Sequence, residues 1–263
     1  MKLRVRYFQT CSNWGDALNP YLLGRLTGCE IAARGNEDCE PGPHLLAIGS
    51  ILQWANADSV VWGTGAMLAD VMLACRPRRI LAVRGPLTRE ICLRSGLDCP
   101  AVYGDPALLM PDVYQPRSVR GGALGIIPHY VDHDSAFVAR CRAAGLTVIN
   151  VFSRIESFVE QVARCSGILS SSLHGLICAD AYGVPSRWIH ISDGVVGNGF
   201  KFRDYYASLG VQEEPIHVDG DSDLDVLKSL PRPKPMPIDR VALRQALLDY
   251  IPTNWAEPLP VAA

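Results

Sequence analysis

The residue types in this chain best suited to chemistry are a histidine in a serine-rich turn and several charged residues that follow short apolar runs. His174 lies in a Ser-Ser-Ser-Leu-His-Gly turn at residues 170–175. An apolar run precedes the turn, and an apolar helical segment that ends near Gly183 follows it. Free N–H groups at a helix start attract anions, and an imidazole exchanges a proton near neutral pH. The turn is therefore our first candidate for an active site.

Four further polar residues follow other predicted strands, where ligands bind in open α/β sheets. They are Asp16, Arg84, Asp105 and His129. Asp16 closes an Asn-Trp-Gly-Asp loop at residues 13–16, which is equally well explained as a turn capped by Asp16. His129 and His133 lack a third ligand, so we expect no metal site.

Two cations stand where a glycine-rich loop runs into a short predicted helix. Lys201 and Arg203 follow the Gly-Asn-Gly run at residues 197–199. Their position would suit a phosphate or carboxylate. A solvated surface loop explains the same pattern equally well.

The pattern around these residues predicts an α/β fold. Continuous apolar runs at residues 45–48, 60–62 and 80–83 are typical of parallel strands that are covered on both faces. Helical stretches at residues 17–26 and 86–95 lie between such runs.

A second α/β set follows a Pro- and Arg-bearing stretch, which suggests two domains and a final helix. We expect an N-terminal α/β domain at residues 1–115 and a C-terminal one at residues 116–237, which ends in a stiff Pro-rich connector. A helix and tail at residues 238–263 would then pack back on the first domain.

Composition excludes several classes of protein. The chain has 263 residues, 48% of them hydrophobic, and a net charge of −2, so no basic excess points to nucleic acid. Charged residues interrupt the apolar ones at the N-terminus, which favours a first strand over a signal peptide. No apolar stretch is long enough to span a bilayer. Nine scattered cysteines without a Cys-x-x-Cys pair suggest a reduced, cytoplasmic protein. No P-loop, Gly-x-Gly-x-x-Gly or Gly-x-Ser-x-Gly motif is present.

Six short motifs, in order, resemble those of the polysaccharide pyruvyltransferase family. They are Asn-Trp-Gly-Asp at 13–16, Trp-Gly-Thr-Gly at 62–65, Val-Arg-Gly-Pro-Leu-Thr-Arg at 83–89, Gly-Asp-Pro-Ala at 104–107, Ser-Ser-Leu-His-Gly at 171–175 and Lys-Phe-Arg-Asp-Tyr at 201–205. The compact length is similar to that of the ketal pyruvate transferases of bacterial exopolysaccharide assembly, such as the xanthan type.

The resemblance implies two Rossmann-like domains in a GT-B-like arrangement, with the active site in the cleft between them. It also implies phosphoenolpyruvate as the donor, no cofactor, and a pyruvate ketal across two sugar hydroxyls as the product, with phosphate released. By motif position, His174 would be the catalytic histidine and Arg84 an arginine that helps to hold the donor. For the reaction so implied, Asp16 or Asp105 could take the proton of the sugar hydroxyl. The residues expected to bind the donor are Arg84, Ser171, Ser172, Leu173, Gly175, Lys201 and Arg203, and those expected on the acceptor side are Asn13, Trp14 and Asp105.

Plainer roles remain open for the same residues. His174 could cap a helix, Arg84 could form an ion pair between domains, and one of the serines could be a simple N-cap. The alternative functions are a GT-B glycosyltransferase that uses a sugar nucleotide, and a non-catalytic carbohydrate-binding component of the assembly machinery.

The same resemblance implies a lipid-linked oligosaccharide or polysaccharide acceptor. The expected location is then the cytoplasmic face of the inner membrane, reached by a peripheral contact. Trp255 and the apolar tail are the candidates for that contact.

Overall fold

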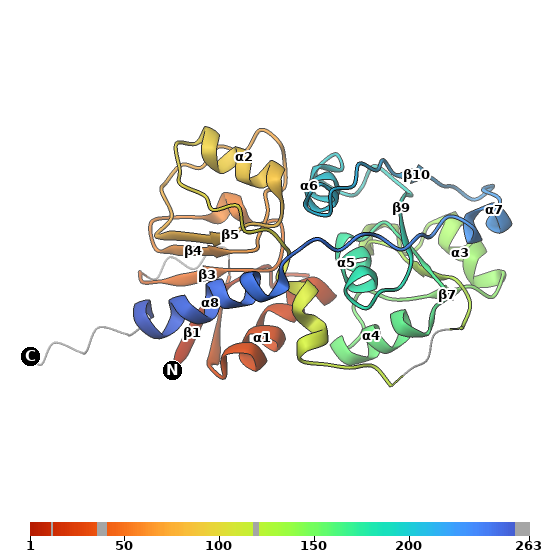
Figure 1. Ribbon diagram of the computed structural model, residues 1–263. Coiled ribbons are helices and arrows are strands. Elements are labelled where there is room, and N and C mark those ends of the chain that lie inside the picture. The colour runs from red at the N-terminus through yellow and green to blue at the C-terminus, as the bar shows by residue number, and fades with distance from the viewer. Residues whose placement is uncertain (12, 36–40, 118–120, 256–263) are drawn as a thin grey trace, which may run out of the picture.

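Two parallel five-stranded sheets form the framework of the protein in the computed structural model, which describes residues 1–11, 13–35, 41–117 and 121–255 (Figure 1). The first sheet has the order β2-β1-β3-β4-β5, with β1 (Lys2–Arg6), β2 (Glu30–Arg34), β3 (His44–Leu46), β4 (Ser59–Trp62) and β5 (Arg79–Ala82). The second has the order β10-β9-β8-β6-β7, with β6 (Gly125–Ile127), β7 (Thr147–Val148), β8 (Ile168–Ser170), β9 (Ser186–His190) and β10 (Ile216–His217). The predicted α/β fold is confirmed, and the two sheets are consistent with two Rossmann-like halves.

Helices connect the strands of each sheet. Within the described residues the α-helices are α1 (Trp14–Thr27), α2 (Pro86–Arg94), α3 (Ala136–Ala143), α4 (Ile155–Arg164), α5 (Leu173–Ala181), α6 (Phe200–Ser208), α7 (Leu224–Lys228) and α8 (Arg240–Asn254). Short 3₁₀ helices are η1 (Leu52–Trp54), η2 (Pro106–Asp112) and η3 (Tyr130–Asp132).

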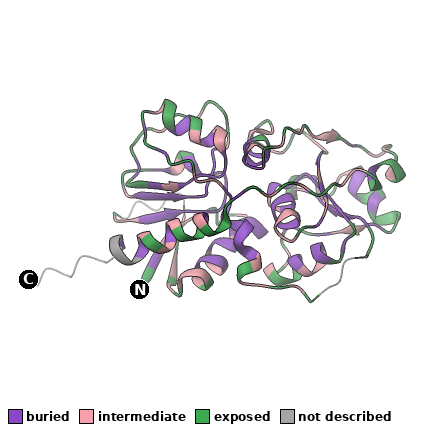
Figure 2. Cartoon of the chain, in the orientation of Figure 1, coloured by how far each residue is buried: buried purple, intermediate pink, exposed green. Residues whose placement is uncertain are grey.

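The apolar runs form the buried layer of each half. Every residue of β3, β4, β6 and β8 is buried, as expected for central strands covered by helices on both faces. Figure 2 shows the buried strands and the exposed outer faces of the surrounding helices. Parallel strands place their carboxyl ends at one edge of a sheet, so the loops that carry the candidate residues gather there.

Helix α8 returns from the second half and lies against the first sheet (Figure 1). The Trp62 indole on β4 donates a hydrogen bond of 2.8 Å to the Leu243 carbonyl, and Leu247 and Ile251 on the same helix are buried. The connector ahead of it is anchored by Lys234, whose buried ammonium lies 3.5 Å from the Asp180 carboxylate on α5.

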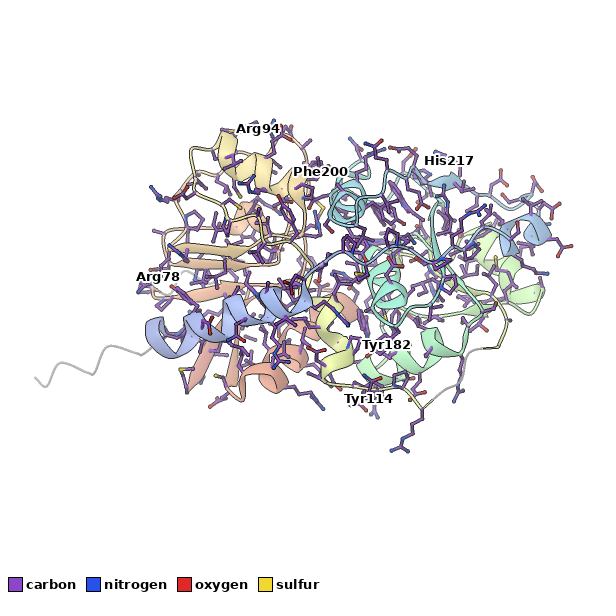
Figure 3. The ribbon with its side chains drawn as sticks, viewed as in Figure 1. Arg78, Arg94, Tyr114, Tyr182, Phe200 and His217 are labelled. Atoms are coloured by element: carbon purple, nitrogen blue, oxygen red, sulfur yellow. The ribbon has the colours of Figure 1, made fainter. Side chains whose placement is uncertain are left out.

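The two halves also meet along α5 and α6. The hydroxyl of Tyr182, at the end of α5, donates to the carbonyl of Tyr114 at 2.8 Å, and Figure 3 shows these two side chains close together. Phe200, at the start of α6, packs against the core formed by β4, β5 and α2.

Some elements differ from those expected. The first helix begins at Trp14 and not at residue 17, because the side chain of Asn13, and not that of Asp16, caps it by accepting from the Gly15 N–H at 3.0 Å. The strand expected before Asp105 is reduced to one bridge at Tyr103, since Asp105 caps η2 two residues later. The edge strand β2 and the short elements β10 and α7 carry little apolar signal and were not predicted.

Candidate active site

His174 reaches from the second half to the start of α1 in the first half. It lies in the first turn of α5, which follows β8 directly and has Ser172 as its N-cap residue. Its imidazole lies over Gly15: a Cβ built on that glycine would be 2.5 Å from Cε1 of the ring and closer still to Nδ1. Only a residue without a side chain leaves room for the ring here.

Asp105 faces the other nitrogen of the imidazole. Its Oδ1 accepts from the Ala107 N–H at 2.9 Å, and its Oδ2 lies 3.5 Å from Nε2 of His174. Both Nε2 and Oδ2 are buried, and neither has a hydrogen bond to the residues that the structure describes. Catalytic contacts are often long in the absence of substrate and tighten in the complex, so this pair is suited to orient the ring.

Asp16 lies next to this pair, in the first turn of α1. Its Oδ2 accepts a hydrogen bond of 2.7 Å from the Asn13 side chain. Burial raises the pKa of Asp16 to about 6, although His174, Asn13 and Lys201 act in the opposite direction. A carboxylate with a pKa near neutrality is well matched to proton transfer.

Lys201 supplies a cation from the first turn of α6. Burial, with a smaller contribution from Arg84, lowers the pKa of Lys201 to about 8, while Asp16 raises it. Across the described residues, its ammonium has neither a hydrogen bond nor an ion pair, and its ring contact is with Phe202, whose centroid is 5.6 Å from Nζ. A buried charge without a counter-ion is costly, which makes this ammonium a candidate for binding an anion.

These side chains converge on one cavity of about 310 Å³. It is lined from the first half by Phe8, Asn13, Asp16, Gly49, Ser50, Ile51, Gln53, Trp54 and Met67, and from the second by His129, Tyr130, Ser172, Leu173, His174 and Lys201. Its volume falls within the usual range of ligand sites, about 300–1,000 Å³. Residues from both halves therefore share one pocket.

The three serines of the turn have different roles. The Ser170 hydroxyl is buried and accepts from the Ser172 N–H at 3.0 Å, while Ser171 donates to Asp132 at 2.7 Å and accepts from the His129 N–H. The Ser172 side chain makes no cap hydrogen bond and lines the cavity. A Cβ on Gly175 would lie 2.5 Å from the Ser170 hydroxyl, so this glycine lets the turn pack closely.

Arg84 is fully buried and its guanidinium is occupied by protein groups. It donates to Asp204 at 2.9 Å, to the Ser50 hydroxyl at 2.6 Å and to the Ala66 carbonyl at 2.8 Å. The ion pair with Asp204 joins the first half to α6, which is the plainer role considered for this arginine. Direct contact with a donor stays a prediction. Arg84 also lies close enough to Lys201 to lower that residue's pKa.

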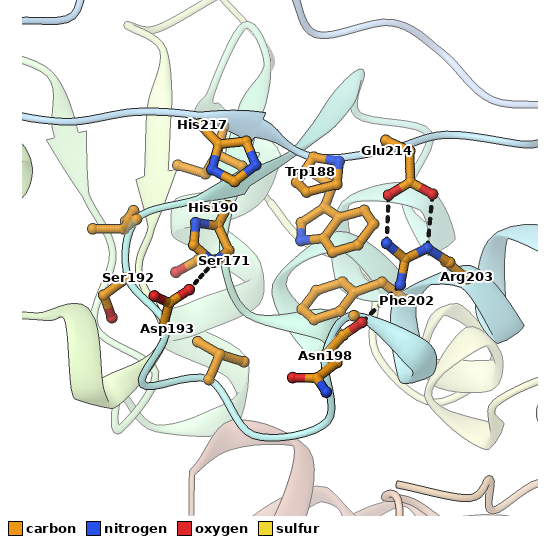
Figure 4. Close-up of a pocket in the computed structure, with 15 residues that line it drawn as sticks. Ser171, Trp188, His190, Ser192, Asp193, Asn198, Phe202, Arg203, Glu214 and His217 are labelled. Carbon is orange, nitrogen blue, oxygen red and sulfur yellow. Dashed lines mark hydrogen bonds and ion pairs between the residues drawn. The ribbon is translucent and has the colours of Figure 1, made fainter. Parts of the chain in front are cut away.

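Arg203 lies away from His174, beside a separate cavity of about 370 Å³ (Figure 4). Its guanidinium donates to both carboxylate oxygens of Glu214 and to the Asn198 carbonyl, and it lies over the Trp188 ring. In contrast with Lys201, this cation is already neutralised by a protein carboxylate. The structure therefore does not bring Lys201 and Arg203 together around one anion.

Two aromatic candidates are buried. Trp14 stacks on Phe158 with ring centroids 4.9 Å apart, and its indole donates to the Ile155 carbonyl at 3.2 Å. Trp255 is 3% exposed, so it does not offer a surface for membrane contact, and residues 256–263 of the tail lie outside the described residues. None of the described helices has the length and apolar character needed to cross a bilayer.

The sequence singled out His129 by its position after a predicted strand but assigned it no role in the site, and it did not single out several aromatic residues that lie there. His129 lies beyond the carboxyl end of β6, and burial, together with the charges of Lys201 and His174, lowers its pKa to about 4. Phe8, Trp54 and Tyr130 line the cavity but belong to no motif in the sequence. Within the described residues, no group of three or more potential ligands could hold a metal ion.

Comparison with known proteins identifies the family. The model of the polysaccharide pyruvyl transferase family matches residues 55–193, more than half of the chain. The uncharacterized protein L143 of Acanthamoeba polyphaga mimivirus is 27% identical over 222 residues, which cover 81% of this chain and 76% of that protein. The succinoglycan biosynthesis protein ExoV of Rhizobium meliloti (strain 1021) is 28% identical over 217 residues, which cover 78% of this chain and 64% of ExoV, less than two thirds of its length. The chain belongs to the polysaccharide pyruvyl transferase family.

Proposed function

We propose that this protein transfers pyruvate from phosphoenolpyruvate to two hydroxyls of a sugar in an exopolysaccharide precursor, forming a pyruvate ketal and releasing phosphate. Family membership supports pyruvate transfer to a polysaccharide acceptor. The observation that carries the choice of donor is the unpaired ammonium of Lys201 in the same cavity as His174 and Asp16.

The donor carries a phosphate and a carboxylate, and the cavity offers matching groups. Lys201 contributes a positive charge and Ser172 a hydroxyl. The first N–H groups of α5, at Leu173 and His174, have no acceptor within the helix and lie at the positive end of its dipole. Together these groups form a binding site for an anion of this kind. Arg203, which Glu214 neutralises, is not part of this proposed site.

His174 and Asp16 divide the proton transfers. Protonated His174, oriented by Asp105, gives a proton to the methylene carbon of the donor. A sugar hydroxyl attacks C2 and loses its proton to Asp16. The bond from C2 to the phosphate oxygen then breaks, and a second hydroxyl attacks C2 and gives its proton to the leaving phosphate. Asp105 is fully buried, whereas Asp16 lines the cavity, so we assign the base to Asp16. Atoms and electrons balance without a cofactor.

In this proposal the two halves adopt a GT-B-like arrangement, and the shared cavity is the active-site cleft. His174 comes from the second half, and Asp16 and Asp105 come from the first. The acceptor is a lipid-linked oligosaccharide or polysaccharide, and the enzyme acts at the cytoplasmic face of the inner membrane.

The deciding experiment measures phosphate release from phosphoenolpyruvate by the purified chain, with and without a panel of hexose glycosides. We expect release only when an acceptor is present, and a loss of about 10²–10⁴-fold in His174→Ala, the usual value of a general acid. His133→Ala is the matched control, because His133 lies outside the cavity and bonds to Arg142.

Two outcomes would overturn the proposal. A sugar nucleotide that raises the melting temperature when phosphoenolpyruvate does not would indicate a glycosyltransferase. Binding of a glycoside with no phosphate release under any condition would indicate a carbohydrate-binding protein.

A further inference from the structure

We propose that the acceptor site holds at least two sugar rings. The terminal ring lies in the catalytic cavity between Phe8 and Tyr130, and the next ring lies in an adjoining groove beneath Phe152. This inference rests on the proposed function for the reaction at the terminal ring, but the binding itself can be measured without turnover.

On the side of the first half, the cavity is lined by a stacked aromatic pair, of which Phe8 is exposed and Trp54 half-buried. Phe8 is 37% exposed and stacks on Trp54, with ring centroids 6.3 Å apart and an angle of 29° between the planes. Arg6 fixes this pair, since its guanidinium donates to the Trp54 carbonyl at 2.9 Å and lies 5.8 Å from the ring centroid. Both aromatic residues line the cavity that contains Asp16.

On the side of the second half, a row of three rings leads out of the cavity. The His129 and Tyr130 rings are 4.3 Å apart, and the Tyr130 and Phe152 rings are 6.1 Å apart. Phe152 is 51% exposed, although it is a large apolar side chain. Exposed apolar side chains that gather around a cavity, unlike single ones, indicate a binding surface.

The backbone around Phe152 holds this ring beside α1. The Phe152 N–H donates to the Asn150 side chain at 2.9 Å, which forms a tight turn. The neighbouring Val151 carbonyl accepts from the Trp14 N–H at 2.6 Å. The exposed ring is therefore positioned by the same segment that presents Asn13 and Asp16.

A second cavity, of about 590 Å³, shares a lining residue with the first one. Phe152, Tyr21 and Ile155 provide apolar surface in it, and Asn13 lines both cavities. Polar groups stand beside that surface: the Tyr21 hydroxyl donates to Glu156 at 2.6 Å, and Arg154 also lines the groove.

A carbohydrate fits this combination of surfaces. A sugar ring presents C–H groups on its faces and hydroxyls around its edge, so it can stack on Phe152 while its hydroxyls bond to the polar groups. A protein segment or a lipid could also cover apolar rings, and the test must separate these occupants from a sugar.

The test compares a monosaccharide with a disaccharide in the wild type and in Phe152→Ala. The probes are the methyl β-glycosides of glucose, galactose and mannose and the matching β-1,4-linked disaccharides. We expect a lower KM for the disaccharide than for the monosaccharide in the wild type. In Phe152→Ala that preference should fall by about 2- to 10-fold, the equivalent of one aromatic contact, while the KM for phosphoenolpyruvate stays constant. Met72→Ala is the control, because Met72 is 67% exposed but lines none of these cavities.

Saturation-transfer NMR with the same sugars gives a readout that is independent of catalysis. The inference is supported if the second ring of the disaccharide gives a saturation-transfer signal that is weaker with Phe152→Ala than with the wild type. This result would count even if phosphoenolpyruvate is not turned over and the proposed function fails. The inference is overturned if no sugar shows contact, or if Phe152→Ala affects monosaccharide and disaccharide equally. If either of these results is obtained while acceptor-dependent phosphate release continues, the proposed function stays intact.

Discussion

Replacement of Gly15 by alanine puts a methyl group where the His174 imidazole now lies. The new Cβ would be 2.5 Å from Cε1 of the ring, whereas carbon atoms in contact are about 3.5 Å apart. The ring must therefore move by at least about 1 Å, away from its position opposite Asp105. A misplacement of this size can cost about 10²-fold in rate, and complete loss of the general acid about 10²–10⁴-fold.

The assay is acceptor-dependent phosphate release, measured for Gly15→Ala and for a matched control in the same helix. A Cβ on Gly24 would meet its nearest neighbour, Ile31, at 3.7 Å, so Gly24→Ala should fold normally and keep its activity. We expect kcat to fall by at least about 10²-fold in Gly15→Ala, while circular dichroism stays unchanged.

A double-mutant cycle tests whether Gly15 acts through His174. In His174→Ala the space over Gly15 is vacant, so adding Gly15→Ala should cause little further loss. Our reasoning is refuted if Gly15→Ala retains the activity of the Gly24→Ala control. It is also refuted if Gly15→Ala lowers kcat by the same factor in the wild type and in His174→Ala.

Three further predictions concern charged groups around the cavity. If Asp16 is the base and Lys201 holds the donor, kcat/KM should rise with pH near 6 and fall near 8. Asp16→Asn should remove the acid limb, and Lys201→Arg should remove the part of the alkaline limb that Lys201 contributes. A limb that persists in its variant belongs to another group, such as His174, which must be protonated to act as the acid, or the phosphate of the substrate. Because burial raises the pKa of Asp16 from 3.8 to about 6, folding of the wild type should become less favourable by about 2 kcal/mol as the pH rises from 4 to 7, and urea unfolding of Asp16→Asn should lack this loss. Asp204→Asn should lower the unfolding free energy by about 3–5 kcal/mol, because it leaves buried Arg84 without its counter-ion, whereas Glu214→Gln at an exposed pair should cost less than about 1 kcal/mol; equal effects would contradict the burial argument.

The fold was largely predictable because its central strands are continuous apolar runs. The same logic places His174 and Asp16 together, since each lies in a helix that begins after a parallel strand and the carboxyl ends of such strands meet. Asp105 follows a single bridge at Tyr103 and not a strand. Short edge strands escaped prediction because they bury few side chains. The apolar runs thus predict the α/β architecture, and the parallel order of the strands predicts part of the site.

The roles of the cations could not be predicted in the same way. Arg84 pairs with Asp204, 120 positions further along the chain, and no local pattern reveals such a contact. Lys201 and Arg203 are two positions apart in one helix, and such residues do not share a face. Lys201 therefore lines the cavity, whereas Arg203 bonds to Glu214. The two directions follow from the start of α6 at Phe200, which places both cations in its first turn.

The return of α8 to the first sheet has a consequence for the order in which the chain folds. The Trp62 indole finds its acceptor at Leu243, and buried leucines of α8 cover the same half. During synthesis, the first half leaves the ribosome with this surface uncovered, and it cannot complete its core until residues 240–254 have emerged. By then the second half is already available to fold. We therefore expect the two halves to reach their native packing together, only after α8 has emerged, with His174 and Asp16 meeting at that stage.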